Sequence, residues 1–599
     1  MPIDEAVPVD GADAVAALGL QGVNRLGLGG SGFPQMAING LSSLSLSSGG
    51  VKSDDHDYSV EESLTWQAGR HVIKVGGELR TFETLAGEVP HYGSFTFNGA
   101  FTGNAYADFL LGLPFRSSRE DPLVNRTRTA GEVGLFVMDT FKVGPRLTLD
   151  YGLRWDYFQS PEFEDRLMFN WDPESGAVVV PPEARDRLSP LFPATIPLVA
   201  GDVVPDPDGG NIRPRLAFAY RVADDLVVRG GYGAFTERID YFSRVQGGGP
   251  FQIAETYENI VQPGEPPLFA FPNPFPNGLG SASVPSQSVT GYPMETDNGT
   301  IHQFNLSVEK EIAGMGLRAS YIGSRGRGLN YSLNINKPEP STTPFTAARR
   351  PYPEFVSTTV FRSDGSSTYD ALQIQAQRRA GPATFDAHWT LSSSLNNFLN
   401  TENPDDVLRH WSRDSDVRRH HAVITSTWRL PSFSTHGALL RSLAGDWTIA
   451  TVSYLASGRY FSPSFSESDP SNTNTIGGLP DRVGDGNLPA DERTPDRWFD
   501  PNAFAVPEPG RYGNSGVNVL EGQGLNVHHL SLAKKVRLSS GMTFTYTVAI
   551  SNLFNHPHFL PARDDISTPG AGELFETVEV HAPEKSSHRT IAMKLRFEF

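Results

Sequence analysis

The chain has 599 residues, of which 38% are hydrophobic and 11% aromatic, and it contains no cysteine. Its formal net charge of −18 argues against nucleic-acid binding, because a phosphate-binding surface needs clustered lysine and arginine. The lack of cysteine excludes disulfides, thiol nucleophiles and cysteine-ligated metals. The sequence also has no run of about 18 apolar residues that would form a membrane-spanning helix.

The N-terminal part, residues 1–56, is predicted to be a loop-rich segment. Residues 1–20 have neither the basic stretch nor the apolar stretch of a secretory signal peptide, so an exported protein with this start would be a truncated chain. Residues 27–32 have the glycine spacing of a dinucleotide-binding loop. No βαβ pattern surrounds them, and a flexible loop is therefore the favoured interpretation.

Residues 57–599 are predicted to form one all-β domain, because apolar and polar side chains alternate in many segments. The segment from Arg146 to Phe158 shows this most clearly, since a strand would place its two sets of side chains on opposite faces. We predict that the apolar set faces lipid: Leu147, Leu149, Tyr151, Leu153, Trp155 and Tyr157. We predict that the charged residues of the other set face a water-filled lumen: Arg146, Asp150, Arg154 and Asp156.

The same alternation recurs in residues 73–80, 303–309, 372–377 and 542–550. We count about sixteen such strands, mostly of about 9 to 13 residues, a length that crosses hydrocarbon at a tilt near 45°. Strands of soluble sandwiches usually have about 5 or 6 residues. The sequence therefore predicts a transmembrane antiparallel up-and-down β-barrel.

The predicted connections alternate between short and long. Tight turns are expected at Ala68-Gly69, Gly144-Pro145, Ala223-Asp224-Asp225 and Ala313-Gly314. Long polar loops are expected at 159–210, 238–298, 325–366, 394–418 and 459–524. Short turns at one rim and long extracellular loops at the other are typical of membrane barrels.

The end of the chain is predicted to be the last barrel strand. Its apolar residues share one face: Ile591, Met593, Leu595, Phe597 and Phe599. We predict that the first four face lipid. An alternating strand with a terminal aromatic residue resembles the signal that the barrel-assembly machinery reads in Gram-negative outer-membrane proteins, which assigns this role to Phe599. The alternative is an edge strand of a soluble sheet, although a soluble edge seldom leaves such a row unprotected. Closure on the first strand would satisfy its backbone hydrogen bonds.

Short motifs along nearly the whole chain resemble those of Oar-like barrels among TonB-dependent receptors. They are Ala107–Pro114, Asp139–Asp156, Asn211–Phe218, Tyr321–Ser324, Tyr369–Gln373, Trp498–Phe504 and Ser551–Pro557. Each is weak alone, and their order makes the resemblance specific. It implies an outer-membrane receptor-transporter that takes up a scarce ligand such as a siderophore, an oligosaccharide or a peptide.

The resemblance also implies parts that this sequence lacks. A full member of the family carries a signal peptide, a small β domain, a TonB box, a plug and the first strands of a barrel of about 22 strands. Partners would be outer-membrane lipid, the small ligand and, only through the missing plug, the TonB complex. No cofactor or catalytic residue is implied.

Other chemistry has little support in the sequence. It has no nucleophile elbow, P-loop or H-E-x-x-H motif, and neighbouring histidines such as His420-His421 and His528-His529 would point to opposite faces of a strand. The pair His556 and His558 is the remaining histidine cluster. An acidic loop with Asp481, Asp485 and Asn487 could offer oxygens to calcium, but it lacks the full ligand spacing, so a solvated turn is favoured. Arg229 and Arg318 join the residues that could line a solute path.

Two other functions fit the same composition. One is a passive pore or surface adhesion barrel that works without a plug. The other is a soluble secreted β-protein that binds carbohydrate through its aromatic residues.

Overall fold

The computed structural model describes most of the chain. The described residues are 15–17, 19–23, 34–41, 52–87, 93–119, 126–238, 246–253, 255–259, 266–275, 287–295, 297–433, 444–466, 468–537, 541–577 and 587–599. Within them, no helix combines the length and the apolar character that crossing a membrane requires.

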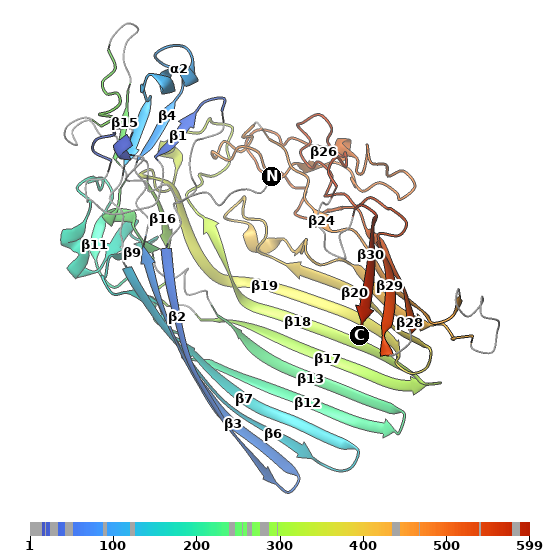
Figure 1. The fold of residues 1–599 in the computed structure, drawn as a ribbon. Helices are drawn as coiled ribbons and strands as arrows, with labels where there is room; N and C mark the ends of the chain where they lie inside the picture. The colour runs from blue at the N-terminus through green and yellow to red at the C-terminus, as the bar shows by residue number, and fades with distance from the viewer. Residues whose placement is uncertain are drawn as a thin grey trace.

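One curved antiparallel sheet forms the body of the protein (Figure 1). Over the described residues it contains fifteen strands of 9 to 24 residues, and each pairs with the next one along the chain. These strands are β2 (Lys52–Ala68), β3 (His71–Gly87), β6 (Arg126–Lys142), β7 (Leu147–Phe158), β12 (Asn211–Ala223), β13 (Leu226–Glu237), β17 (Gly299–Ile312), β18 (Met315–Asn334), β19 (Phe355–Arg378), β20 (Ala383–Asn396), β22 (His420–Arg429), β23 (Trp447–Ala456), β28 (Leu525–Arg537), β29 (Thr543–Ser551) and β30 (Thr590–Glu598). The all-β meander confirms the predicted fold class.

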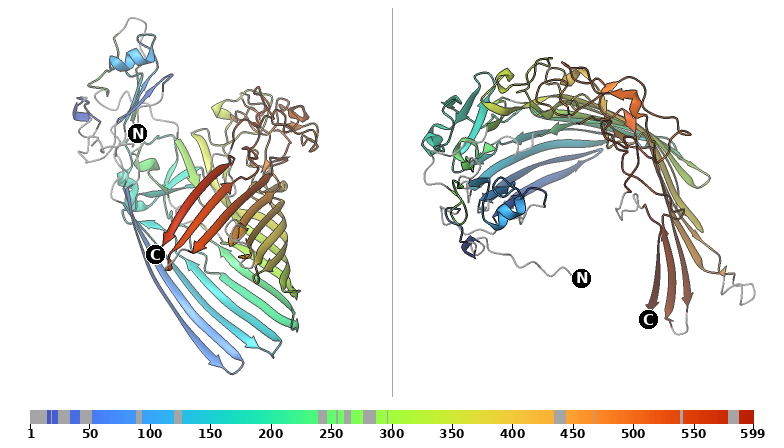
Figure 2. Two further views of the ribbon diagram at one scale, coloured as in Figure 1. Left: turned by 45° about the vertical axis from the view of Figure 1, so that its right-hand side comes forward. Right: turned by 90° about the horizontal axis from the view of Figure 1, so that it is seen from above.

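Seen from above, the sheet follows an open arc with β2 and β30 at its two ends (Figure 2). Among the described residues, β2 pairs with β3 alone and β30 with β29 alone. The expected pairing of the last strand with the first is thus not found within these residues. Three short strands lie at the margin of the sheet: β8 (Glu162–Phe163), β16 (Gln287–Gly291) and β21 (Ser412–Arg413).

The sheet has two chemically different faces. We call the side that carries Leu153 the apolar face and the side that carries Arg154 the polar face. Leu153 lies opposite Val137 of β6 and Pro214 of β12, so apolar residues continue from strand to strand in register. Arg154 lies opposite Phe136 and Arg213 on the other side. Because successive side chains of a strand alternate, this register fixes the face of every residue in the regular strands.

Short and long connections lie at opposite rims of the sheet. The turns at 69–70, 143–146, 224–225 and 313–314 are as short as predicted. Ala313 and Gly314 both have positive φ, 51° and 73°, which is the geometry of a type I′ hairpin turn.

The seven long connections meet at the other rim, at 88–125, 159–210, 238–298, 335–354, 397–419, 457–524 and 552–589. The predicted loop 325–366 was too long, because β18 continues to Asn334 and β19 already begins at Phe355.

The long connections carry small folded units of their own. The first is a sheet of β1 (Gln35–Ile38), β4 (Ser94–Phe97), β5 (Arg116–Arg119) and β15 (Glu255–Glu258), with helix α2 (Ala105–Leu110) beside it. Its core contains Met36, Phe95, Phe97 and Tyr257, all almost fully buried. Part of the N-terminal segment that was predicted as loop is therefore a strand, held by residues from two later connections.

Two further units follow the same principle. The second is a sheet of β9 (Met168–Asp172), β10 (Ala177–Val180), β11 (Leu198–Ala200) and β14 (Gln246–Gly247), packed around the buried Trp171 and Phe355. The third surrounds Phe499, Phe504 and Leu520 and contains β24 (Tyr460–Phe461), β25 (Asp481–Arg482), β26 (Phe504–Ala505) and β27 (Leu520–Glu521). Short 3-10 helices complete the connections: η1 (Pro182–Arg187), η3 (Gly249–Phe251), η5 (Ala347–Arg349), η6 (Val407–Arg409) and η7 (Pro501–Ala503).

Candidate functional site

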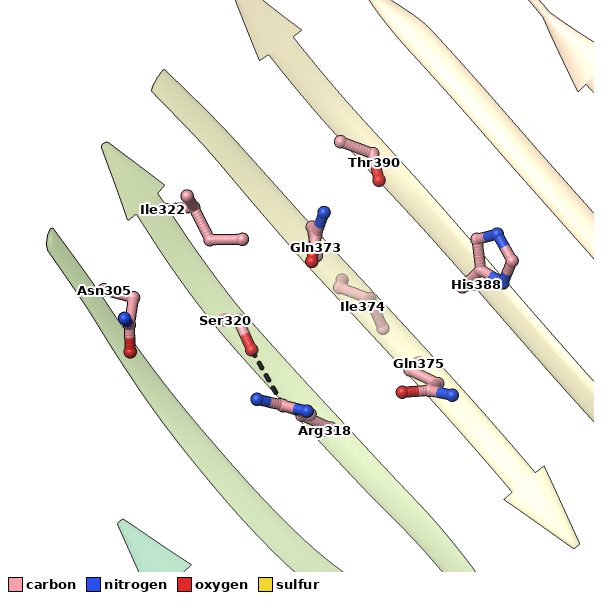
Figure 3. A pocket seen from close by; sticks show the side chains of 9 residues that line it. All are labelled: Asn305, Arg318, Ser320, Ile322, Gln373, Ile374, Gln375, His388 and Thr390. Atoms are coloured by element: carbon pink, nitrogen blue, oxygen red, sulfur yellow. Dashed lines mark hydrogen bonds between the residues drawn. The ribbon is translucent and has the colours of Figure 1, made fainter. Parts of the chain in front are cut away.

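The polar face carries a pocket of about 380 Å³ over strands β17 to β20 (Figure 3). Its lining consists mostly of amides and hydroxyls: Asn305, Arg318, Ser320, Ile322, Gln373, Ile374, Gln375, His388 and Thr390. Uncharged groups of this kind both donate and accept hydrogen bonds. The pocket is thus a hydrogen-bonding surface with one cation, Arg318.

The strand register builds this surface in rows. Ser320 lies opposite Gln373, which lies opposite Thr390 on the next strand. The neighbouring row joins Arg318, Gln375 and His388 in the same way. Residues two apart along a strand share a face, so the two rows stand side by side.

Carboxylates on the same face offset the positive charge of the pocket. The Glu309 Oε1 atom lies 3.5 Å from the Nε atoms of both Arg318 and Arg229. Both arginines are among the residues that the sequence proposed for a solute path, and the structure brings these two to one carboxylate. All three side chains are at least one-third exposed, so each pair stabilises the wall by less than about 1 kcal/mol.

Asp386 contacts two residues that line the pocket, Gln375 and His388. Gln375 donates a hydrogen bond of 3.0 Å to Asp386, and the His388 ring lies 3.6 Å from the same carboxylate. Among the described residues, no side-chain hydrogen bond engages Asn305, Gln373 or Thr390. Their polar groups are therefore available to a solute or to another protein segment.

The polar face is more strongly charged near β2, β3, β6 and β7. Arg154 donates to Asp156 at 2.7 Å and to Glu78 at 3.3 Å, and Thr140 donates to Asp150. Asp150, Arg154 and Asp156 thus share one face, as the sequence predicted. Arg146 lies in the turn before β7, where its backbone carbonyl accepts from the Arg221 amide. That water fills the space in front of these residues remains a prediction.

The residues predicted to face lipid share the apolar face. On β7 most of them lie opposite apolar partners, such as Leu149 opposite Phe141 and Phe218, whereas Tyr151 lies opposite Asp139 and donates a hydrogen bond of 2.6 Å to it. On β30 they are well exposed, with 70% of Met593 and 58% of Phe597 accessible. Trp155 and Tyr157 stack with their ring centroids 6.2 Å apart. Lipid contact by this face remains a prediction, as does the assembly role of Phe599, which follows the end of β30.

The acidic loop is arranged as a set of ion pairs. The Arg511 guanidinium donates hydrogen bonds to both carboxylate oxygens of Asp481, and Arg482 donates a hydrogen bond of 2.8 Å to Asp485. Arginines therefore occupy the carboxylates that calcium would need. Within the described ranges, no group of three or more histidines and carboxylates is placed to hold a metal ion.

Sequence reasoning missed a partly buried polar cluster that joins three long connections. Lys337 donates to the Glu402 backbone carbonyl at 2.8 Å, and the Glu402 carboxylate accepts from the Leu479 amide at 2.7 Å. Burial lowers the pKa of Lys337 and raises the pKa of Glu402. Burial also raises the pKa of Tyr512, whose ring lies 5.9 Å from the Lys337 ammonium. The two residues of each contact are 65 or more positions apart and follow no local pattern, so the sequence held no signal for them.

Residues 4–590 match the family described as outer membrane beta barrel domain. No curated protein matches the chain. Among solved structures it is similar to the outer membrane transporter YddB from Escherichia coli, with 9% identity and a TM-score of 0.48, over 91% of this chain and 54% of that one. The copper transporter OprC matches with 13% identity and a TM-score of 0.42, over 91% and 56%. The ferric yersiniabactin uptake receptor FyuA from Yersinia pestis matches with 11% identity and a TM-score of 0.41, over 95% and 57%. The chain thus spans little more than half the length of these structures.

Proposed function

This chain belongs to the outer membrane β-barrel domain family, and from that premise we propose that it forms the membrane-spanning wall of a TonB-dependent receptor-transporter. The protein is located in the outer membrane of a Gram-negative bacterium. In this proposal, the predicted barrel domain, residues 57–599, forms the wall together with residues 52–56 at the start of β2, and the wall surrounds the path of a scarce ligand.

One observation carries the proposal, namely the chemical difference between the two faces of one continuous sheet. Rows of exposed leucine, valine and aromatic residues run across the apolar face, which suits contact with hydrocarbon. The opposite face carries the amide and hydroxyl pocket and paired charges, which suit a water-filled interior. A soluble protein of this size would bury its apolar rows instead.

The strands β2 and β30 form the two ends of the sheet. In a bilayer, backbone amides and carbonyls of an edge strand must find hydrogen-bond partners. Over the described residues, β2 and β30 each have a partner strand on one side only. In this proposal, hydrogen-bond partners on the second side of β2 and of β30 complete the wall, and energy coupling to TonB would require a plug that contacts the polar face. The long connections would select the ligand, whether a siderophore, an oligosaccharide or a peptide.

The test combines membrane location with energy dependence. We expect the protein to fractionate with outer membranes and to migrate faster on gels before heating than after. We expect uptake of its ligand, from a panel of the three ligand classes, to stop when TonB is deleted. A water-soluble product whose mobility does not change on heating would rule out the wall. Uptake that continues without TonB would favour the passive pore.

A further inference from the structure

Three depressions of the polar face join into one groove. The pocket of Figure 3 shares Asn305 with a hollow of about 240 Å³ over β12 and β13, and it shares Arg318 and Gln375 with a depression of about 340 Å³ beside the short turns. From Arg215 of β12 to Thr390 of β20 the groove crosses six neighbouring strands. At a strand spacing of about 4.8 Å this width is roughly 24 Å, which suits an extended ligand.

The groove descends along the wall toward the rim of short turns. Its end farther from that rim is at Phe235, nine residues beyond the first residue of β13. Arg318 lies only three residues beyond the first residue of β18. Both strands begin at the short turns, which face the periplasm in outer-membrane barrels. The groove thus runs in the direction in which an imported ligand would move.

Two glycines shape the hollow over β12 and β13. A Cβ atom would lie 3.3 Å from the Asn305 amide nitrogen at Gly231 and 3.0 Å from the Phe235 ring at Gly233. Glycine at both positions therefore keeps side chains out of the space beside the ring and the amide. Phe235 is 36% exposed, and the Arg215 guanidinium lies 5.0 Å from its ring centroid. An exposed aromatic ring next to amides offers an apolar surface for C–H groups and hydrogen bonds for hydroxyls.

The floor of the groove presents uncharged hydrogen-bonding groups in two dimensions. They belong to Gln303, Asn305, Ser320, Gln373, Gln375 and Thr390. A side-chain amide both donates and accepts, as does each hydroxyl of a sugar. A peptide presents its polar groups along one backbone, whereas the neighbouring rows that contain Gln373 and Gln375 match a ring that carries hydroxyls on several sides.

The charges around the groove disfavour an anionic ligand. In the hollow, Arg215 is accompanied by Asp150, which has the opposite charge. The depression beside the short turns is lined by four carboxylates and two cations: Asp224, Asp225, Glu309, Glu311, Lys310 and Arg318. Negative charge remains in excess there even when Arg229, which shares Glu309, is included. An anionic ferric siderophore complex would be repelled on its way to the short turns, and an uncharged ligand would not.

We infer that the ligand of this wall is a neutral oligosaccharide that lies extended in the groove. One sugar ring packs against Phe235, and sugar hydroxyls exchange hydrogen bonds with the side-chain amides of Asn305 and Gln373. The inference rests on the proposed transport function and narrows its three ligand classes to one.

The experiment measures binding to the full chain in detergent micelles by isothermal titration calorimetry. The neutral probes are hexasaccharides of α-1,4-glucose, β-1,4-glucose, β-1,4-xylose and β-1,4-N-acetylglucosamine. The contrasting probes are the α-1,4-galacturonate hexamer, an anionic ferric tris-catecholate and an uncharged hexapeptide. We expect saturable binding of at least one neutral hexasaccharide, and binding of the galacturonate hexamer that is at least about tenfold weaker, because its carboxylates meet those beside the short turns.

The variants N305A and Q373A test the groove itself. Each should weaken binding of the tightest hexasaccharide by at least about threefold, since one hydrogen bond between neutral groups strengthens binding by roughly this factor. Gln67 is a matched control, because it is an exposed amide on the polar face of β2, away from the groove. Q67A should bind as the unaltered chain does. Equal losses in Q67A and the two groove variants would overturn the inference.

Failure of this inference differs from failure of the transport function. A chain that fractionates with outer membranes and shows heat-dependent gel mobility, yet binds none of the neutral hexasaccharides, would keep the wall and lose the oligosaccharide. Preferred binding of the ferric complex or of the hexapeptide would overturn the inference in the same way. A water-soluble chain would contradict the transport function, and with it the inference that rests on that function.

Discussion

The Lys337 ammonium donates a hydrogen bond of 2.8 Å to the backbone carbonyl of Glu402, and this contact joins two long connections of the sheet. The Glu402 carboxylate extends the link to a third connection through the Leu479 amide. Asp469 and Tyr512 complete the set of titratable groups that act on Lys337 and Glu402. Three long connections distant in sequence are therefore held together by partly buried polar contacts.

The stability of this loop assembly should depend on pH through Glu402. Because burial raises the pKa of Glu402, its protonated form is favoured in the folded loops. Its contribution is fully present below the ordinary glutamate pKa and is lost as the pH rises through the raised value. We expect backbone hydrogen exchange at residues 468–524, corrected for its intrinsic pH dependence, to be slower at pH 4.5 than at pH 7.5. In E402Q, which keeps an acceptor for Leu479, the difference should shrink. An unchanged difference would show that other groups cause it.

Loss of the Lys337 side chain should affect the order of the long connections more than the stability of the sheet. K337M keeps the length of the side chain but removes the hydrogen bond to Glu402, at a cost of about 1 kcal/mol. We expect faster hydrogen exchange at residues 397–406 and no change in heat-dependent gel mobility. Lys594, on the polar face of β30, is a control outside the loops, and K594M should leave this exchange unchanged. Equal exchange in K337M and the unaltered chain would contradict the link.

The period of two made the sheet predictable, because it is a local property of each strand. The segment predicted from Arg146 to Phe158 is β7, which starts one residue later at Leu147. The period of two did not predict the part of β18 in which the pairing with β19 is irregular. Register shifts near Leu329 and a positive φ of 65° at Gly328 interrupt the alternation, so a loop was predicted from residue 325 although β18 continues to Asn334.

The units on the long connections could not be predicted, because their contacts are distant in sequence. Gln35 of β1 pairs with Ser94 of β4 in a parallel ladder, and β5 pairs with β15 more than 130 residues later. No local sequence pattern predicts such pairs of strands. The motif Trp498–Phe504 was recognised only as a resemblance. The structure gives it a physical role, because Phe499 and Phe504 are core residues and the Trp498 indole donates to the Glu521 carbonyl.

Phe499 should be the residue on which the third loop unit depends most. It is 1% exposed and packs edge-to-face against Phe461 and Phe504, with centroid distances of 5.9 and 6.1 Å. Truncation of a buried phenylalanine typically costs about 3 to 5 kcal/mol. We expect F499A to raise hydrogen exchange throughout residues 498–521. Phe575 is 57% exposed in a neighbouring connection, so F575A is the matched control and should have little effect. Comparable effects of the two variants would mean that Phe499 is not a core residue.

The assignment of the two faces is tested most directly by adjacent residues of β7. Leu149 is on the apolar face, and Thr148 is on the polar face opposite Lys142 and Ala219. If Leu149 meets lipid in the middle of the bilayer, L149R should lower the free energy of unfolding by roughly 2 to 4 kcal/mol, because an arginine would then meet hydrocarbon.

T148R adds the same side chain one position away and should cost far less, since its charge would meet water and other polar groups. Urea-induced unfolding of both variants in lipid vesicles gives the comparison. Equal penalties would mean that both faces meet the same solvent, and then neither a lipid-facing wall nor a water-filled lumen could be assigned to this sheet.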